Sequence, residues 1–221
     1  MDLSVIIPSR NEEFLGRTIN DILDKARAET EVIVILDGYW PDPPIPDRKN
    51  VVFIHHTESI GQRAAVNEGA CLSKAKFIMK LDAHTVVDEG FDVKLMADCE
   101  YDWTVIPRMY NLYGFDWVCK KCGNRWYQGP EPTKCKKNVG REKLEDNEKC
   151  DSVEFEREII WKPRWNRRTD FARFDSTMHF QYWRQYDDRP ESKTDIADVM
   201  STIGNGLFMH RGKILRFRRN G

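Results

Sequence analysis

Residues 77–84 read Phe-Ile-Met-Lys-Leu-Asp-Ala-His, an apolar run that passes directly into the polar group Asp82-Ala83-His84. Such a run, continuous except for Lys80, is typical of a strand that is buried on both faces. In an extended chain, Asp82 and His84 point to the same side. Carboxylate oxygen and imidazole nitrogen suit Mn²⁺, and Mg²⁺ less well. Alone, such a pair is more often a solvated strand end, so the surrounding sequence decides its meaning.

Strand-like and helix-like segments alternate on the N-terminal side of this motif. Apolar runs rich in β-branched residues predict strands over residues 3–8, 32–36, 51–55 and 77–81. Apolar residues at helical spacing predict helices over residues 13–28 and 61–72. This alternation predicts an α/β fold with a Rossmann-like, mostly parallel sheet and helices on both faces. Asp37 and Asp82 end the second and fourth strands, so we expect both at the sheet edge where ligands bind.

The composition describes an ordinary globular chain. It has 221 residues and a net charge of -1, so no global field favours nucleic acid or membrane. No run approaches the roughly 20 apolar residues of a membrane span. The first residues form a predicted strand and lack the basic region of a signal peptide, so we expect a cytoplasmic protein, in a virus-infected or other host cell.

Four of the six cysteines gather in a lysine-rich segment that has few aliphatic residues, namely Cys119, Cys122, Cys135 and Cys150. Such a segment cannot build its own core, so a bound metal would have to replace it. Cys119 and Cys122 form a Cys-x-x-Cys pair, and two further thiolates complete a tetrahedral Zn²⁺ site. We therefore predict a small zinc-binding insertion over residues 117–152, with disulfides or free thiols as the alternative. The second pair departs from the Cys-x-x-Cys spacing.

Five motifs, in order, resemble glycosyltransferase family 2 and its relatives of the GT-A fold. They are residues 4–12, residues 32–38 with the acidic end, the helix of residues 61–70, residues 81–84 and residues 204–208. The Asp-X-His form at Asp82 is similar to that of polypeptide N-acetylgalactosaminyltransferases, as is the late glycine strand Gly204-Asn205-Gly206-Leu207-Phe208. The resemblance implies a GT-A-like fold and transfer of a sugar from a nucleotide-sugar donor, a UDP-sugar above all, to an acceptor hydroxyl.

The resemblance also implies roles for individual positions. The residues that would bind the donor nucleotide are Pro8, Arg10, Glu12, Asp37, Arg63 and Asp82. Asp37 would bind the ring N–H of the base, and Asp82 would contact the ribose or the metal and so take part in catalysis. His84 would ligate Mn²⁺ or Mg²⁺, and His210 is a candidate third ligand. For Arg63 and Glu12, a surface position and a helix-capping role are the simpler alternatives.

One feature of the family is missing after the glycine strand. Inverting members usually follow this strand with an acidic motif that supplies the catalytic base, and none stands between Gly206 and Gly221. The base then comes from elsewhere, or the reaction is retaining, or the chain is shorter than its gene product. Among carboxylates before the last strand, Asp187 and Asp188 are our candidates for the base, with Asp175 also available.

The acceptor side is expected after the predicted zinc insertion. We predict a nucleotide-sugar-binding half over residues 1–116 and an acceptor-side part over residues 153–221 that completes the domain. Arginines alternate with aromatic residues in the candidate acceptor-binding set, Trp161, Arg164, Trp165 and Arg167. Arginines neutralise phosphates and aromatic rings stack on bases. Viral DNA that carries a hydroxymethylated base is therefore one candidate acceptor. A glycan, protein or small molecule is the alternative, as is a nucleotide-sugar-binding protein without turnover.

Overall fold

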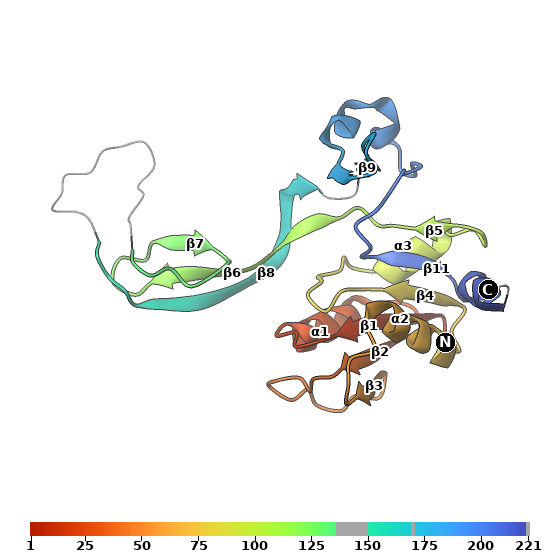
Figure 1. Ribbon diagram of the computed structural model, residues 1–221, viewed down its shortest axis with the longest axis horizontal. Coiled ribbons are helices and arrows are strands. Elements are labelled where there is room, and N and C mark those ends of the chain that lie inside the picture. The colour runs from red at the N-terminus through yellow and green to blue at the C-terminus, as the bar shows by residue number, and fades with distance from the viewer. Residues whose placement is uncertain (136–149, 169–170, 220–221) are drawn as a thin grey trace. The chain divides into compact units, whose positions relative to one another are not determined.

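The computed structural model describes residues 1–135, 150–168 and 171–219, without the side chains of residues 166–168 and 217–219. The chain divides into two units (Figure 1), Met1–Tyr110 with Arg168–Gly221 as the first and Asn111–Arg167 as the second. The borders expected at residues 116 and 153 both fall inside the second unit. This is because β6 (Tyr110–Cys119) and β8 (Phe155–Arg168) pair with each other in one sheet.

The first unit is built on a six-stranded sheet in the order β3-β2-β1-β4-β11-β5. Four of its strands are parallel, namely β1 (Leu3–Ser9), β2 (Thr30–Asp37), β3 (Val51–His56) and β4 (Phe77–Lys80). The strand β11 (Leu207–His210) runs antiparallel between β4 and β5 (Thr104–Val105). These pairings confirm the predicted fold class, a mostly parallel sheet within an α/β domain.

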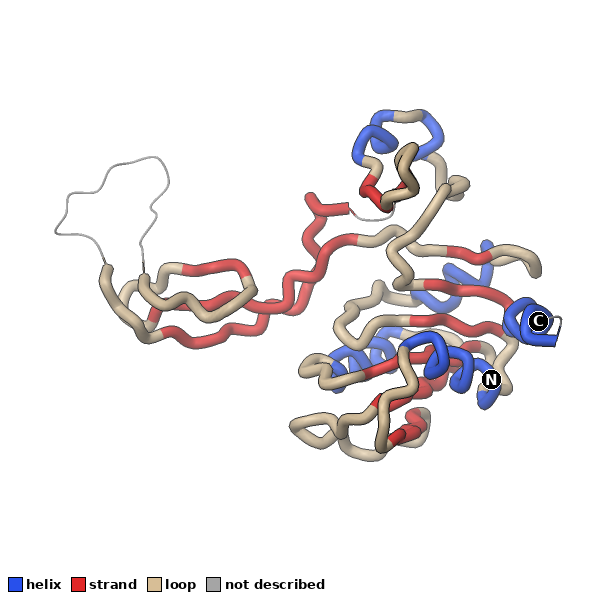
Figure 2. The backbone as a smooth tube through the Cα atoms, in the orientation of Figure 1, coloured by secondary structure: helices blue, strands red, loops and turns tan. Residues whose placement is uncertain are grey.

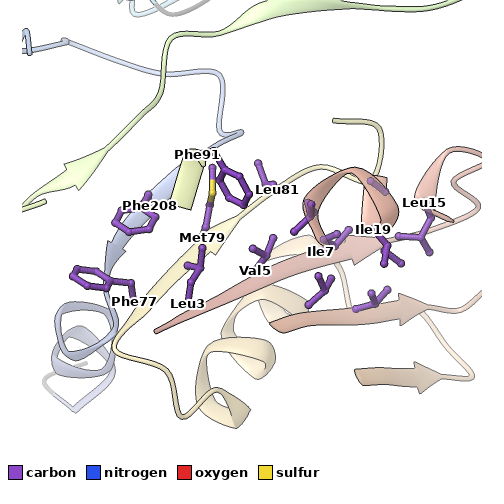
Figure 3. Close-up of a cluster of buried hydrophobic side chains, with 14 of the residues drawn as sticks. Leu3, Val5, Ile7, Leu15, Ile19, Phe77, Met79, Leu81, Phe91 and Phe208 are labelled. Carbon is purple, nitrogen blue, oxygen red and sulfur yellow. The ribbon is translucent and has the colours of Figure 1, made fainter. Parts of the chain in front are cut away.

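Helices cover both faces of this sheet, as the unbroken apolar strands predicted. On one face, α1 (Leu15–Lys25) and α3 (Phe91–Asp98) pack against alternate residues of the strands in the main core. Figure 3 shows part of this core, with Phe77 of β4 beside Phe208 of β11. On the other face, α2 (Gln62–Leu72) and α4 (Arg211–Arg219) contribute to smaller clusters around Ile6 and Ile35.

The rest of the first unit follows residue 168 and returns to the sheet. It contains β9 (Ala172–Phe174) paired with β10 (Phe180–Tyr182), and the short 3-10 helices η2 (Arg184–Asp188) and η3 (Pro190–Lys193). Arg108 donates to the carbonyl oxygens of Ser192 and Thr194, each at 2.9 Å, and so ties this segment to the chain after β5. No helix in the described part of the chain is both long and apolar enough to cross a membrane.

The second unit is a three-stranded antiparallel sheet with β6 between β7 (Arg125–Tyr127) and β8, drawn as red strands in Figure 2. Its small core consists of the buried Cys119, Cys135, Cys150 and Phe155, with Trp117 and Trp126 packed against them. Thiol groups therefore occupy the place that aliphatic side chains take in an ordinary core, in agreement with the scarcity of aliphatic residues in this segment.

Candidate active site

The carboxyl ends of the parallel strands bring the predicted donor residues to one edge of the sheet. In register, Ser9 at the end of β1 lies beside Leu36 of β2, and Ile6 lies beside Lys80 at the end of β4. Because only β1 separates β2 from β4, these two strands lie about 10 Å apart. The expectation that both carboxylates share this edge is confirmed.

The loop that carries Asp82 and His84 is held on one side by α1. The hydroxyl of Thr18, which is fully buried, donates to the carbonyl oxygen of Ala83 at 2.8 Å and accepts from the N–H of Thr85 at 3.0 Å. The side chain of Ala83 is also buried, so it anchors the loop in the core. Asp82 and His84, on either side of it, keep exposed side-chain fractions of 29% and 52%, which leaves both accessible to a ligand.

On its other side, the same loop is held by the turn that precedes β11. The side-chain oxygen of Asn205 accepts from the N–H groups of Asp82 and Gly206, both at 2.9 Å, and its amide donates to the Thr85 hydroxyl at 3.3 Å. Lys80 ion-pairs with Asp82 and donates to the carbonyl oxygen of Gly204 at 2.9 Å. The late glycine motif therefore touches the Asp-X-His motif directly.

The imidazole of His84 faces Glu12, with Nδ1 of His84 3.1 Å from Oε2 of Glu12. Glu12 lies just ahead of α1, where its carbonyl oxygen accepts from the N–H of Leu15. When Nδ1 carries the hydrogen and donates it to the carboxylate, Nε2 is the atom left with a lone pair for a ligand. A carboxylate behind a histidine in this way is a common arrangement at metal sites.

Asp37 is nearly fully buried at the end of β2, and it holds the loop that leads into α2. Its carboxylate accepts from the Ser59 hydroxyl at 2.8 Å and from the N–H groups of Ile60 and Gly61 at 2.6 and 3.1 Å. Burial acts to raise the pKa of Asp37, but these hydrogen bonds and the charge of Arg10 outweigh it and hold the pKa below its usual range. The side chain is therefore an anion with most of its acceptor positions used.

Of the other expected donor residues, Arg10 lies near Asp37. Arg10 is exposed, donates to the Ser59 hydroxyl at 3.3 Å and has its guanidinium carbon 5.8 Å from the centre of the Tyr39 ring. Pro8 is half-buried near the end of β1, and Arg63 is exposed in the first turn of α2. The structure thus gathers Arg10 and Asp37 through Ser59, and leaves Arg63 on the surface of its helix.

His210 does not reach this site, contrary to our expectation of a third metal ligand. It pairs in register with Phe77 at the opposite end of β4, roughly 16 Å along the strand direction from Asp82. Its ring packs beside Tyr101 and Phe77, and its Nδ1 accepts from the N–H of Gly212 at 3.1 Å. The reason is the antiparallel direction of β11, which places the glycine turn, and not His210, beside Asp82.

Asp187 and Asp188, the candidates for the catalytic base, lie on η2. The carbonyl oxygen of Asp187 accepts from the Ser192 hydroxyl at 3.0 Å, and its side chain is half-buried, whereas that of Asp188 is exposed. The side chain of Asp175 is engaged with its own turn through Thr177 and His179.

The four clustered cysteines converge in the second unit. Their sulfur atoms all lie within 4.8 Å of one another, with 3.7 Å between Cys119 and Cys150 and 3.6 Å between Cys122 and Cys135. All four are free thiols. Burial opposes ionisation of Cys119, but the N–H groups of Cys122 and Lys121 hydrogen-bond its sulfur and lower its pKa to about 6. Gly123, with φ of 70°, closes the Cys-x-x-Cys turn by donating to the carbonyl oxygen of Cys119.

Most of the expected acceptor residues lie on β8 as single exposed or half-buried side chains. The Arg164 guanidinium carbon lies 4.1 Å from the centre of the Tyr127 ring, and Trp165 is 71% exposed. Trp161 is half-buried and has the uncommon φ of 50°. The side chain of Arg167 lies outside the described residues. Arg164 and Trp165 are thus accessible on this strand.

Sequence reasoning did not assign a role to Asn205, Thr18 or Lys80, although each contacts the metal-motif loop. Lys80 did carry a signal, since it is the one charged residue in the apolar run of residues 77–81. Asn205 lies between the two glycines of the late glycine motif. Thr18 looked like any polar helix residue, because only tertiary structure brings it to Ala83.

Comparison with known proteins identifies the family of the chain. The family described as Glycosyl transferase family 2 matches residues 4–181, well over half of the chain. No curated protein matches the chain. Among solved structures, the chain is similar to S. aureus TarS, at 19% identity and a TM-score of 0.36, over 44% of this chain and 19% of that one.

A shorter form of the same protein, S. aureus TarS 1-349, matches with the same identity and TM-score, and 32% of its length is covered. The chain thus spans less than a third of the length of these two solved structures. The family match includes the sheet edge that carries Asp37, Asp82 and His84, and it confirms the resemblance seen in the sequence. The chain belongs to glycosyl transferase family 2.

Proposed function

We propose that this protein transfers a sugar from a nucleotide diphosphate sugar to an acceptor hydroxyl, with the donor bound along the edge formed by the ends of β1, β2 and β4. The observation that carries the proposal is the convergence of Asp37, Asp82, His84 and Glu12 on that edge. Membership of the family supports the class of reaction. The donor base would lie near Asp37 and the diphosphate near Asp82 and His84.

The state of Asp37 supports a base that presents a ring N–H. An ionised carboxylate offers about four acceptor positions, and Ser59, Ile60 and Gly61 use three of them. One more donor can therefore be accepted, and the ring N–H of uracil is such a donor. Adenine has no ring N–H in its common form, so an ADP-sugar fits less well. Guanine also carries a ring N–H, so the state of Asp37 argues only against an ADP-sugar, and we propose a UDP-sugar on the strength of the family resemblance.

The chemistry of Asp82, His84 and Glu12 fits a divalent ion, Mn²⁺ in preference to Mg²⁺. Asp82 would offer a carboxylate oxygen and His84 would offer Nε2, while Glu12 would hold the His84 ring by accepting from Nδ1. When bound, the ion would stabilise the negative charge that develops on the leaving diphosphate. Asp82 and His84 are the two ligands that we propose, and the remaining positions would be taken by the donor and water.

For the acceptor we propose DNA that carries a hydroxymethylated base, bound with the help of the half-buried Arg164 and the exposed Trp165 of β8. Arg164 stacked over Tyr127, together with the 71% exposed Trp165, provides a cation and flat aromatic surfaces of the kind that contact phosphates and bases. A glycan, protein or small-molecule acceptor is the alternative. With either acceptor, Asp187 or Asp188 would serve as the base that deprotonates the acceptor hydroxyl in an inverting reaction.

For the cysteine cluster we propose a structural Zn²⁺. A tetrahedral Zn²⁺ with bonds of about 2.3 Å to sulfur places the four sulfurs about 3.8 Å apart. The distances of 3.6 and 3.7 Å are close to this value and far from a disulfide bond. The burial of Cys119, Cys135 and Cys150 supports a structural role, because a catalytic zinc needs an open position.

A panel of UDP-, GDP- and ADP-sugars with and without Mn²⁺ tests the central proposal. We expect UDP-sugars to raise the midpoint of thermal unfolding in the presence of Mn²⁺. We also expect the protein to release UDP slowly from the donor, and Asp82→Ala and His84→Ala to abolish this release. Failure of every nucleotide to bind would overturn the proposal, and binding without any release of UDP would favour a binding protein without turnover.

The salt dependence of transfer tests the DNA acceptor separately. Transfer to DNA should fall steeply between low and physiological salt, because each phosphate contact releases counterions, while hydrolysis of the donor stays constant. Arg164→Ala should weaken DNA binding and reduce its salt dependence, with the exposed Arg184 of η2 replaced by alanine as the control. Transfer to a small acceptor at a rate independent of salt would favour a glycan, protein or small-molecule acceptor.

A further inference from the structure

Lys80 is a buried cation in a strand whose other residues are apolar. Its side chain is 8% exposed, and its neighbours Phe77, Ile78, Met79 and Leu81 all belong to the hydrophobic core clusters. Its ammonium group ion-pairs with the carboxylate of Asp82 and donates to the carbonyl oxygen of Gly204 at 2.9 Å. It thus links the first residue of the metal motif to the late glycine turn.

Stability alone does not explain this lysine. Removing an ammonium group from water costs several kcal/mol, and apolar side chains of similar volume often serve a buried position as well or better. A methionine would continue the pattern of Met79 and fill the same space. The charge matters for what it contacts, and its two partners are Asp82 and the turn of residues 204–206.

Asn205 makes a second link between the same two segments. Its side-chain oxygen accepts from the N–H groups of Asp82 and Gly206, and its amide donates to the Thr85 hydroxyl. Gly204 and Gly206 have φ of 80° and 67°, a conformation that favours glycine, so the sequence Gly-Asn-Gly can form this turn readily. The asparagine is therefore presented toward the metal motif by the backbone on either side.

We propose that Lys80 and Asn205 are positioning residues, a latch that fixes the carboxylate of Asp82 for the donor diphosphate and its ion. This inference rests on the proposed function of the edge. Lys80 holds Oδ1 of Asp82 and so directs Oδ2 to the ligand, while Asn205 fixes the Asp82 backbone and, through Thr85, the far end of the loop. Neither residue is proposed to touch the donor. The turn before β11 thereby becomes part of the donor site.

Calorimetric titration of UDP in the presence of Mn²⁺ tests the latch in the full chain. We expect Asn205→Ala to weaken UDP binding about 10- to 100-fold, the usual effect of losing a group that orients a metal ligand. Asn205→Asp keeps the acceptor for Asp82 and Gly206, so it should restore most of the affinity. Thr85→Val removes only the hydrogen bond at the far end of the loop, so its expected loss of affinity is no more than about threefold. Asn50→Ala, at an exposed position ahead of β3, is the control.

Lys80→Met and Lys80→Arg separate positioning from folding. Lys80→Met should weaken UDP binding about tenfold or more while the thermal midpoint stays the same or rises, whereas Lys80→Arg should keep much of the affinity. Wild-type affinity in both Asn205→Ala and Lys80→Met would overturn the latch. The latch would also be overturned if the loss of affinity paralleled the loss of thermal stability in every variant and Asn205→Asp did not restore the affinity.

Hydrogen exchange of the backbone amides gives a readout that needs no donor. The N–H of Asp82 should exchange faster in Asn205→Ala than in the wild type or in Thr85→Val, and unchanged exchange would count against the latch. If the wild-type protein binds no nucleotide with Mn²⁺, the proposed function fails. If it binds and the variants bind equally well, only the latch fails.

Discussion

Nδ1 of His84 lies 3.1 Å from Oε2 of Glu12, although 72 residues separate the two in the chain. The contact joins the loop after β4 to the segment that enters α1. It orients the imidazole, because a carboxylate that accepts from Nδ1 leaves Nε2 as the atom for a metal ion. On the proposed function, Glu12 would therefore belong with the metal end of the site, whereas the family resemblance implies a place near the donor nucleotide.

Glu12→Gln should lower the affinity for Mn²⁺ in the presence of UDP about 10- to 100-fold. A glutamine amide can donate to Nδ1, which favours the tautomer with hydrogen on Nε2 and removes the lone pair that a metal needs. Calorimetry or Mn²⁺ paramagnetic resonance measures the change. Glu156→Gln, at an exposed position of the second unit, is the control. Unchanged affinity in Glu12→Gln would remove Glu12 from the site.

Asp37→Asn should destabilise the protein at neutral pH by about 1–3 kcal/mol, since the bonds from Ser59, Ile60 and Gly61 lose a charged acceptor. The pKa of Asp37 is lowered in the folded state, so its contribution is fully present above its unfolded pKa of about 3.9 and is lost as the pH falls through the lower folded value. The difference between variant and wild type in urea unfolding should therefore shrink below about pH 4. A difference independent of pH would contradict this account.

Removal of the proposed zinc should unfold the second unit and leave the first unit folded. The protein should contain one zinc ion per chain, and Cys135→Ser or a strong chelator should remove it, because the buried sulfurs replace an apolar core. Tryptophan fluorescence would report the change, since Trp117 and Trp126 pack against the cluster. Cys71→Ser, at an exposed thiol in α2, is the matched control. A zinc-free protein with unchanged fluorescence would contradict the prediction.

Gly69→Ala should destabilise the first unit by about 1–3 kcal/mol, the usual range for overpacking. A Cβ at this position would lie 2.6 Å from Cγ2 of Ile6, a fully buried residue of β1. Gly16→Ala in α1 is the matched control, because its Cβ would meet Ile45 at an ordinary 3.5 Å and should stabilise the helix by up to about 1 kcal/mol. Thermal unfolding followed by circular dichroism compares the two, and equal midpoints would contradict the prediction.

The fold of the donor half could be read from the sequence because its signals are local. Unbroken apolar runs such as residues 32–36 must be buried on both faces, and the alternating helices then favour a parallel sheet. Asp37 and Asp82 follow such runs directly, so their common edge needed no tertiary information. The short strand β5, the helices α3 and α4 and the strand β6 were not predicted. Their residues mix apolar and polar side chains without a clear period.

What the sequence by itself determined is which residues of the donor edge stand at strand ends, and which thiols form one group. Only the tertiary structure decided their partners. The antiparallel pairing of β11 with β4 removes His210 from Asp82 and brings Asn205 to it, and the packing of α1 brings Glu12 to His84. The physical reason is that the burial of the whole core sets strand direction and helix packing. The partners in these contacts are 72 and 123 positions apart in the chain, so no local sequence pattern reveals them.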